Sequence, residues 1–446
     1  MNSPMKDCLK NILVFLITFI VCVGTLLLVC QIPQSAIQKN SKKSAEYFSG
    51  HEGFPLLIGD KINSRSDNYA DCVLLNVIYN MDSDNSFKAI IADSYYRHDG
   101  EDASDDYEDA VFNGKNPNNE YSRYWHGSQV FIRPLLTITS IEGIRLVIFG
   151  LLLALNIWLA ALLVKRKLYS AAAIYFISML LVEIWMTAFS LEYVMSFLVM
   201  TGACIAVVYA KKRATYIFIA TGMVTCFLDF LTCETLTFTV PVILLLVIRS
   251  KYEALGSFKS EISKIIKYGL AWLISYGLMF SAKWLLVYAV LGKSAFINAL
   301  QNAAFRIEGT VTVDGLGLGE AVNLWQRLSG VILRNLACLF PVGSHVTSSM
   351  VFGLALGTLA VLGAVFYLFR KEPTDGKFIG LLLLIGLIPY LRFLCLSNHA
   401  YIHYFFTYRA QMATVMVIFS ILVFSLSPSY VLGKNNKAGK TGKKQK

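Results

Sequence analysis

The sequence is short of charge: only 15% of its 446 residues are Asp, Glu, Lys or Arg, whereas 56% are hydrophobic. Soluble globular domains carry about 25% charged residues, so this balance excludes an ordinary soluble fold. The nine cysteines include no CxxC pair and form no disulfide framework, and we interpret them as small hydrophobic residues. GxSxG and P-loop motifs are also missing, which removes two familiar signatures of soluble enzymes.

The chain instead contains repeated apolar runs of about 20 residues, the length that crosses a bilayer. Lys and Arg gather in the short loops between runs and in the C-terminal tail, which is the positive-inside pattern. This pattern accounts for the net charge of +11 without a nucleic-acid partner. We predict an all-α polytopic membrane protein with about ten transmembrane helices and both termini cytoplasmic. The predicted spans are 11–31, 144–164, 171–189, 191–210, 216–231, 236–248, 265–291, 351–369, 378–396 and 410–424.

Four regions follow from this topology. They are an N-terminal anchor helix (1–31), a large, mostly helical extracytoplasmic loop (32–138), a multi-span bundle (139–432) and a basic cytoplasmic tail (433–446). The bundle contains a second outer segment at about 292–347. The first loop holds 16 of the 29 acidic residues, so it cannot be a span. Within it, residues 70–79 have apolar side chains at helical spacing and predict an amphipathic helix on the membrane surface.

Ionisable side chains fall mainly toward the predicted outer ends of the spans. A charge in hydrocarbon costs roughly 2.5–3.5 kcal/mol, so such groups normally face a partner or a watery cavity. Several such groups at one depth in the membrane favour a shared polar cavity under the first loop. The alternative is that each side chain extends separately to the membrane interface. These residues are Glu183, Glu192, Asp229, Glu234, Lys283, Arg392, His399, His403 and Arg409.

Two pairs of carboxylates are candidates for chemistry. Asp67 and Asp71 are four residues apart and would share one face of a helix, where one could act as a general base. The structural alternative is that the first is an ordinary helix N-cap. Asp229 and Glu234 form a tight acidic turn between two spans, which could bind an acceptor, a cation or only its basic neighbours.

Basic residues occur in two stretches that predict contact with a lipid phosphate, because guanidinium groups bind phosphate oxygens in pairs. The alternative for the first stretch is an aromatic belt with basic anchors at the interface. His399 and His403 are four residues apart, but no third ligand lies nearby, so we predict no zinc site. The candidate phosphate ligands are Arg123, His126 and Arg133 in the first stretch, and Arg392, His399, His403 and Arg409 near the second.

One span, a large acidic outer loop and further spans with outer basic residues resemble the GT-C class of integral-membrane glycosyltransferases. The resemblance implies a sugar donor linked to polyprenyl phosphate, a base at Asp67 or Asp71, and phosphate contacts from Arg392, His403 and Arg409 with Arg123 or Arg133. The stretches DNYADCVLLN, RYWHGSQVFIRPLL and NHAYIHYFFTYRAQ are also similar to uncharacterised polytopic membrane proteins of Gram-positive bacteria.

The leading functional hypothesis is therefore transfer of a sugar from a polyprenyl-phosphate donor to a cell-envelope glycan or lipid, on the outer face of a bacterial plasma membrane. Two alternatives stay open: a transporter or flippase of a lipid-linked or anionic substrate, and a non-enzymatic envelope assembly protein. The sequence predicts no cofactor, and a divalent cation in the acidic turn is the one open alternative.

Overall fold

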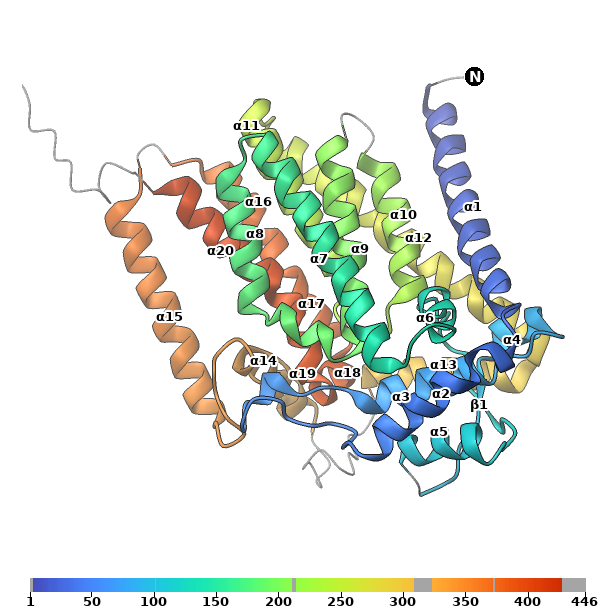
Figure 1. Ribbon diagram of the computed structural model, residues 1–446. Helices are drawn as coiled ribbons and strands as arrows, with labels where there is room; N and C mark the ends of the chain where they lie inside the picture. The colour runs from blue at the N-terminus through green and yellow to red at the C-terminus, as the bar shows by residue number, and fades with distance from the viewer. Residues whose placement is uncertain (1–2, 101, 211–213, 309–322, 372–373, 427–446) are drawn as a thin grey trace, which may run out of the picture.

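The computed structural model describes residues 3–100, 102–210, 214–308, 323–371 and 374–426. Within these ranges the chain is mainly helical, and its strands are the two-residue β1 (Ser94–Tyr95) and β2 (Asn119–Glu120), which pair antiparallel. Figure 1 shows a bundle of long helices with a layer of shorter helices across one end. We call that end the loop end. The predicted all-α fold is confirmed, and the predicted tail, 433–446, lies outside the described residues.

The long helices form a membrane-type bundle. Among the described residues, seven helical segments are long and apolar enough to cross a bilayer, and α8, α10 and α11 are shorter, with 13, 15 and 17 residues. Each of the ten predicted spans thus corresponds to a helical segment of the bundle, and the chain is a multi-pass membrane protein. The bundle helices are α1 (Ser3–Cys30), α7 (Ile141–Lys165), α8 (Tyr169–Leu181), α9 (Leu191–Tyr209), α10 (Ala214–Leu228), α11 (Leu236–Tyr252), α12 (Phe258–Leu291), α15 (Ser348–Phe369), α16 (Gly376–Gly386), α17 (Ile388–Cys395) and α20 (Met412–Ser425).

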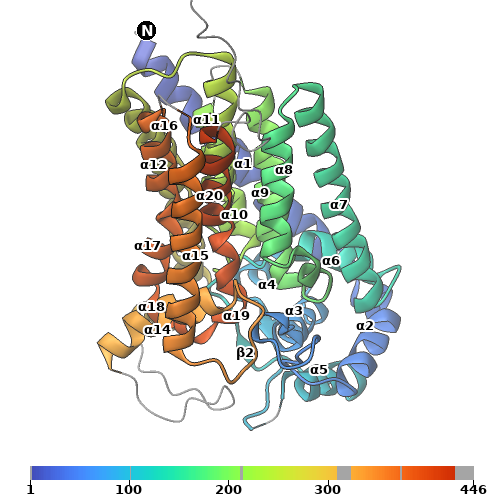
Figure 2. The same ribbon diagram turned by 90° about the vertical axis from the view of Figure 1, so that its left-hand side faces the viewer.

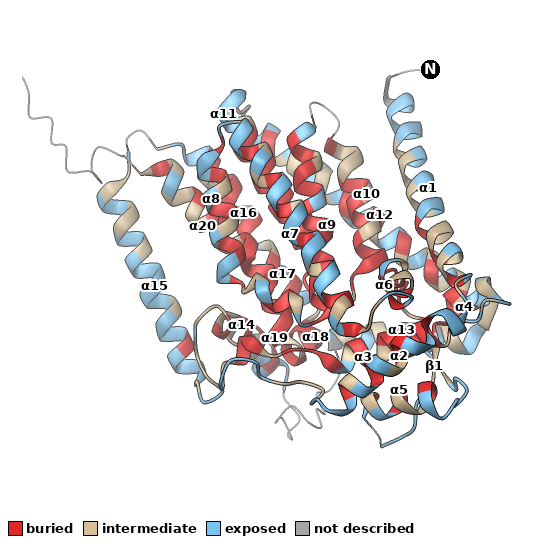
Figure 3. Ribbon diagram, viewed as in Figure 1, coloured by how far each residue is buried: buried red, intermediate tan, exposed pale blue. Residues whose placement is uncertain are grey.

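Burial is uneven across this bundle. Helix α9 is central, with 83% of its most apolar window buried, whereas the corresponding share for α15 is only 6%. Figure 3 shows the same contrast, with buried residues concentrated on the inner helices and exposed residues along α15. Since the exposed side chains of the outer helices are mostly large and apolar, this surface suits a lipid bilayer.

The first loop folds into the layer at the loop end (Figure 2). Helix α3 is packed against α2 and α5, and it buries nine of its twelve residues. The predicted helix at 70–79 is therefore present, but it does not lie on the membrane surface. Its apolar side chains surround the helix rather than forming one stripe, so they require partners on several sides. The elements of this layer are α2 (Gln34–Ser49), η1 (Ile62–Ser64), α3 (Asn68–Tyr79), α4 (Ser86–Ala92), α5 (Ala103–Phe112) and α6 (Gln129–Leu136).

Later parts of the chain complete the loop end. Helix α13 follows α12 after a turn at Gly292, which has φ +89°. Helices α13 and α14 both pack on α18, so three segments distant in the sequence meet there. These later elements are η2 (Ile184–Ala188), α13 (Lys293–Glu308), α14 (Leu324–Ala337), α18 (Ser397–Ile402), α19 (Tyr404–Thr407) and η3 (Tyr408–Gln411).

Two buried ion pairs join the layer to the bundle. Lys283 of α12 donates to Asp93 Oδ2 at 2.8 Å, and Arg145 of α7 donates to Asp71 Oδ2 at 2.6 Å. All four side chains are at most 5% exposed. Because each charge is paired across the junction, the layer cannot separate from the bundle without exposing or stranding a charge.

Candidate functional site

A cavity of about 490 Å³ lies at the loop end, between the layer and the bundle. Its walls come from α3, the β1–β2 pair, the segment before α6, the start of α9, helix α13 and the α18–α19 region. A polar cavity is therefore present beside the first loop, but of the nine ionisable residues predicted to share it only Glu192, His399 and His403 line it. The structure brings together six of the predicted site residues in it: Asp67, Asp71, Arg123, His126, His399 and His403.

The segment before α6 is fixed against the bundle by backbone contacts. Gly127 N donates to Phe227 O at 2.8 Å, and a Cβ at this position would collide with Phe227. The indole of Trp125 donates to Met279 O at 2.9 Å. His126 between them has φ +48°, a conformation that costs energy for a residue with a side chain. The packing thus holds His126 at the cavity wall in a strained backbone.

Asp67 is the buried carboxyl at the start of α3. It is 4% exposed and caps the helix by accepting from Ala70 N at 2.8 Å. Its carboxyl also contacts the carboxyl of Glu192, in the first turn of α9, and two carboxyls in contact share a proton. Burial raises the pKa of Asp67 to about 7, and the charge of Asp71 reinforces this while the Ala70 amide opposes it. Asp67 can therefore gain and lose a proton near neutral pH.

Asp71, the second predicted carboxylate, has different surroundings. Its carboxylate accepts from Arg145 Nε at 2.9 Å and Nη2 at 2.6 Å. Its Oδ1 and Oδ2 also accept from Leu191 N, at 3.0 and 3.2 Å, at the N-terminus of α9. Although it lines the cavity, its oxygens are occupied by these structural contacts. Of the two candidate bases, Asp67 is the one whose carboxyl is less occupied by structural contacts.

Of the three arginines on the cavity wall, Arg97 is exposed, and the other two are half-buried without a carboxylate partner among the described residues. Arg123 lies over the ring of Tyr121, 4.0 Å from its centroid, and Arg306 comes from α13. In the described part of the chain, the Nε atoms of both are buried and make no hydrogen bond. Among the described residues, neither guanidinium pairs with an Asp or Glu. Buried cations normally have a counter-charge, so this wall is suited to an anionic ligand.

The three cavity histidines are neutral hydrogen-bonding groups. Burial, with nearby positive charge, lowers the pKa of His126, His399 and His403 well below the usual value. His403 Nε2 lies 3.1 Å from Arg306 Nη1, which can only donate, so the proton of His403 is on Nδ1. This Nδ1–H has no hydrogen-bond partner among the residues that the structure describes. His126 Nε2 donates to Tyr121 O at 3.0 Å, so its unpartnered Nδ1 is an acceptor.

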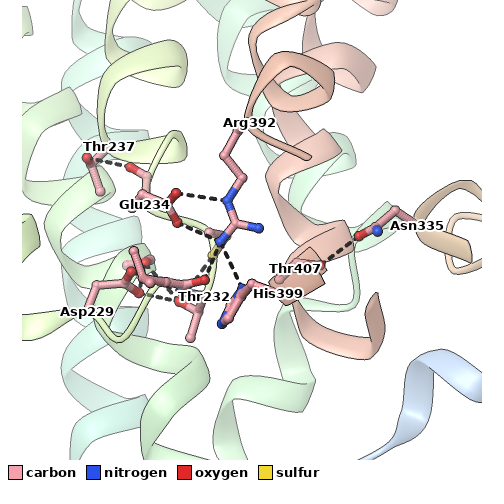
Figure 4. A network of polar contacts seen from close by, with 11 residues as sticks. Asp229, Thr232, Glu234, Thr237, Asn335, Arg392, His399 and Thr407 are labelled. Atoms are coloured by element: carbon pink, nitrogen blue, oxygen red, sulfur yellow. Dashed lines mark hydrogen bonds and ion pairs between the residues drawn. The ribbon is translucent and has the colours of Figure 1, made fainter. Parts of the chain in front are cut away.

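The acidic turn forms a separate network beside the cavity (Figure 4). Arg392 Nε and Nη2 donate to Glu234 at 2.8 and 3.2 Å, and Asp229 accepts from Ser196 and Thr232. None of these residues lines the cavity. The network reaches it indirectly, because Arg392 Nη2 lies 3.5 Å from Nδ1 of His399. That contact leaves the other ring nitrogen of His399 as the donor.

Besides Arg392, two further predicted phosphate ligands lie outside the cavity. Arg133 is fully buried and donates to the backbone carbonyls of Ile32 and Ile78. Arg409 is 1% exposed, and its guanidinium lies 4.5 Å from the ring centroid of Tyr193. Both cations are thus used inside the protein, one by carbonyl oxygens and one by an aromatic face. In both cases the sequence shows only that an arginine lies toward the outer face of the membrane. It does not show which groups the guanidinium contacts.

Glu192 and Arg306 are two ionisable cavity residues that were not among the predicted site residues. Glu192 is one of the ionisable residues at the span ends, but nothing in the sequence connects it with Asp67. Arg306 lies in the mixed second outer segment, where its only signal is a helical pattern. Among the described residues, no group of three or more His, Cys, Asp or Glu side chains is arranged to hold a metal ion.

No protein-family model, characterised protein or solved structure matches this chain. The chemistry of the site therefore carries the functional argument. One side of the cavity offers a carboxyl that titrates near neutral pH, and another offers two guanidinium groups that form no ion pair with the described residues. Such a site can remove a proton from one ligand while binding the anionic part of another.

Proposed function

We propose that the protein is a GT-C-like membrane glycosyltransferase, which moves a sugar from a polyprenyl-phosphate donor to a cell-envelope glycan or lipid. In this proposal the loop end faces outward from a bacterial plasma membrane. The observation that carries it is the presence of Asp67, with a pKa of about 7, in the same cavity as Arg123 and Arg306. A transferase of this type requires a base for the acceptor and fixed positive charge for the leaving phosphate.

The proposed step is a single displacement with inversion at the anomeric carbon. Asp67 takes the proton of an acceptor hydroxyl, whose oxygen forms the new bond to the sugar. The bond from the sugar to the phosphate oxygen breaks, and its electron pair leaves with the lipid phosphate. Arg123 and Arg306 balance the charge that develops there, and His403 Nδ1–H is placed to donate to the same group.

The cavity also bears on the other two functions considered from the sequence. A non-enzymatic assembly protein needs no cavity beneath the loop, whereas the structure has one of about 490 Å³. A transporter or flippase requires ionisable groups near the bilayer midplane and a path to the opposite end. The charged residues that line this cavity all belong to the loop end. We therefore favour transfer over transport.

Removing both half-buried cavity arginines, Arg123 and Arg306, is expected to abolish function in cells. Each arginine–phosphate contact contributes roughly 1.5–3 kcal/mol, or about 10- to 100-fold in affinity. A host strain that lacks the gene should lose one sugar from its envelope glycans, and the wild-type gene should restore it. The Arg123→Gln/Arg306→Gln protein should fail to restore it at equal expression. Monosaccharide analysis of purified envelope material measures this outcome.

Lys88→Gln is the matched control, because Lys88 is an exposed cation in the same loop. It should restore the sugar fully. If deletion leaves every envelope sugar unchanged, or if the double arginine variant restores the missing one, the glycosyltransferase proposal is wrong.

Transfer should also depend on pH through Asp67. The base is active only when deprotonated, and its pKa of about 7 leaves about a tenth of it in that form at pH 6. The rate at saturating donor should therefore rise about tenfold from pH 6 to pH 8 and then level off. Initial rates in proteoliposomes, with the sugar donor identified by the complementation experiment, measure this profile. A rate that is constant between pH 5.5 and 8.5 would contradict the assignment of Asp67 as the base.

A further inference from the structure

The cavity has an apolar extension, which we call the annex. The annex has a volume of about 140 Å³ and shares Arg123, Tyr124, Asn302 and Arg306 with the cavity. A larger apolar groove of about 580 Å³ lies on the side of the bundle, between α7, α9 and α10. That groove shares no lining residue with the cavity. Of these two apolar hollows, only the annex is continuous with the arginines.

The walls of the annex come from two membrane-spanning segments and the helix that crosses between them. Phe280 and Trp284 belong to α12, Ala303 and Ile307 belong to α13, and Leu396 directly follows α17. In Figure 1, α13 lies at the loop end below the bundle helices. The annex therefore lies at the depth where the bundle meets the layer, and its walls are almost entirely apolar.

The annex also reaches the surface of the bundle. Ile307, on its wall, is 44% exposed, and Leu394, two residues before Leu396, is 40% exposed. The inner end is fixed by the indole of Trp284, which donates to Arg123 O at 3.2 Å. One end thus presents guanidinium groups and the other presents apolar side chains of membrane-spanning helices. This polarity matches an amphiphile with an anionic head and a hydrocarbon chain.

We infer that the annex between α12, α13 and α17 is the passage for the hydrocarbon chain of a lipid phosphate, whose phosphate lies between Arg123 and Arg306. The small volume holds only the first carbons of the chain, and the remainder enters the bilayer past Ile307 and Leu394. The identity of the carried sugar rests on the proposed function, but binding of the lipid phosphate does not. In this inference the hydrocarbon chain does not lie in the groove between α7, α9 and α10.

Photocrosslinking of the wild-type protein locates the chain directly. The full-length protein in phosphatidylcholine nanodiscs is incubated with a polyprenyl phosphate that carries a benzophenone on its first isoprene unit, and then irradiated. Crosslinked peptides should come from α12 and α13, and excess undecaprenyl phosphate should remove them. Crosslinks confined to α7, α9 and α10, or none that undecaprenyl phosphate displaces, would overturn the inference.

A filled annex tests whether the chain, rather than phosphate alone, is recognised. Ala303→Phe places a ring in the annex, and Ala304→Phe is the matched control because Ala304 is exposed one residue further along α13. Because the ring takes the space of the first carbons of the chain, Ala303→Phe should weaken undecaprenyl phosphate binding by about tenfold or more. Inorganic phosphate, measured as a competitor of the labelled lipid, should keep its affinity within about twofold, because it has no chain to displace.

Ala304→Phe should leave both affinities unchanged. Equal weakening of lipid phosphate and inorganic phosphate by Ala303→Phe, or no weakening of either, would count against the passage. The two proposals can fail separately. Annex crosslinks without any sugar transfer would refute the transferase and keep the passage, whereas transfer with crosslinks only in the groove would do the reverse.

Discussion

Replacing Asp67 with Asn is expected to lower the rate of sugar transfer by about 10²- to 10⁴-fold, the usual contribution of a general base. The amide has the shape of the carboxyl but cannot take the proton of the acceptor hydroxyl. It can still cap α3 by accepting from Ala70 N, and Asn is as good an N-cap as Asp. The melting temperature should therefore stay close to that of the wild type while the rate falls. Initial rates and thermal unfolding of the same purified sample measure both quantities.

The control for this prediction is Asp84→Asn, an exposed carboxylate in the same loop, which should change neither quantity. Glu192→Leu gives a second comparison, because it removes the side chain whose hydrogen bond lowers the pKa of Asp67. It should raise the pKa of Asp67 and move the pH profile to higher pH without removing the base. Wild-type rates in Asp67→Asn would show that Asp67 is not the base, whatever the other variants do.

The spans could be predicted from the sequence because length and hydropathy are local properties of each run. The positions of Arg123, His126, His399 and His403 at the cavity could also be anticipated, since polar residues beside a membrane tend to gather at one level. The sequence could not separate these residues from Arg133, which looks the same in sequence. Its guanidinium is used by the carbonyls of residues far away in the chain, and no local pattern records that contact.

The same limit applies to the two candidate carboxylates. Asp67 and Asp71 are equivalent in the sequence, four residues apart before an apolar helix. Their difference comes from Arg145, which is 74 residues beyond Asp71 and lies in the first turns of a span. Arg306 could not be assigned to the site for a related reason. It reaches the cavity only because the turn at Gly292 directs α13 back across the loop end.

Arg145 is expected to be the most important single residue for stability at the junction of layer and bundle. Arg145→Met removes the guanidinium and leaves the fully buried Asp71 without its counter-charge. Breaking a buried pair in this way costs about 3–5 kcal/mol. Lys165→Met is the matched control, since it removes an exposed cation from the same helix, and it should cost much less. Chemical unfolding of the purified protein in detergent measures the free energy of unfolding.

The pH dependence of the stability of Arg145→Met distinguishes an unpaired buried carboxylate from a simple loss of packing. Burial already raises the pKa of Asp71, and removal of Arg145, which opposes that shift, should raise the pKa further. A carboxyl with a raised folded-state pKa stabilises the fold at low pH and loses that contribution as the pH rises. Arg145→Met should therefore be more stable at pH 5 than at pH 8. The double variant Asp71→Leu/Arg145→Met leaves no unpaired carboxylate. At pH 8 it should be less destabilised than Arg145→Met, and its stability should no longer depend on pH in this way. If the single variant is equally unstable at both pH values, the cost comes from lost contacts of the Arg145 side chain and not from an unpaired carboxylate.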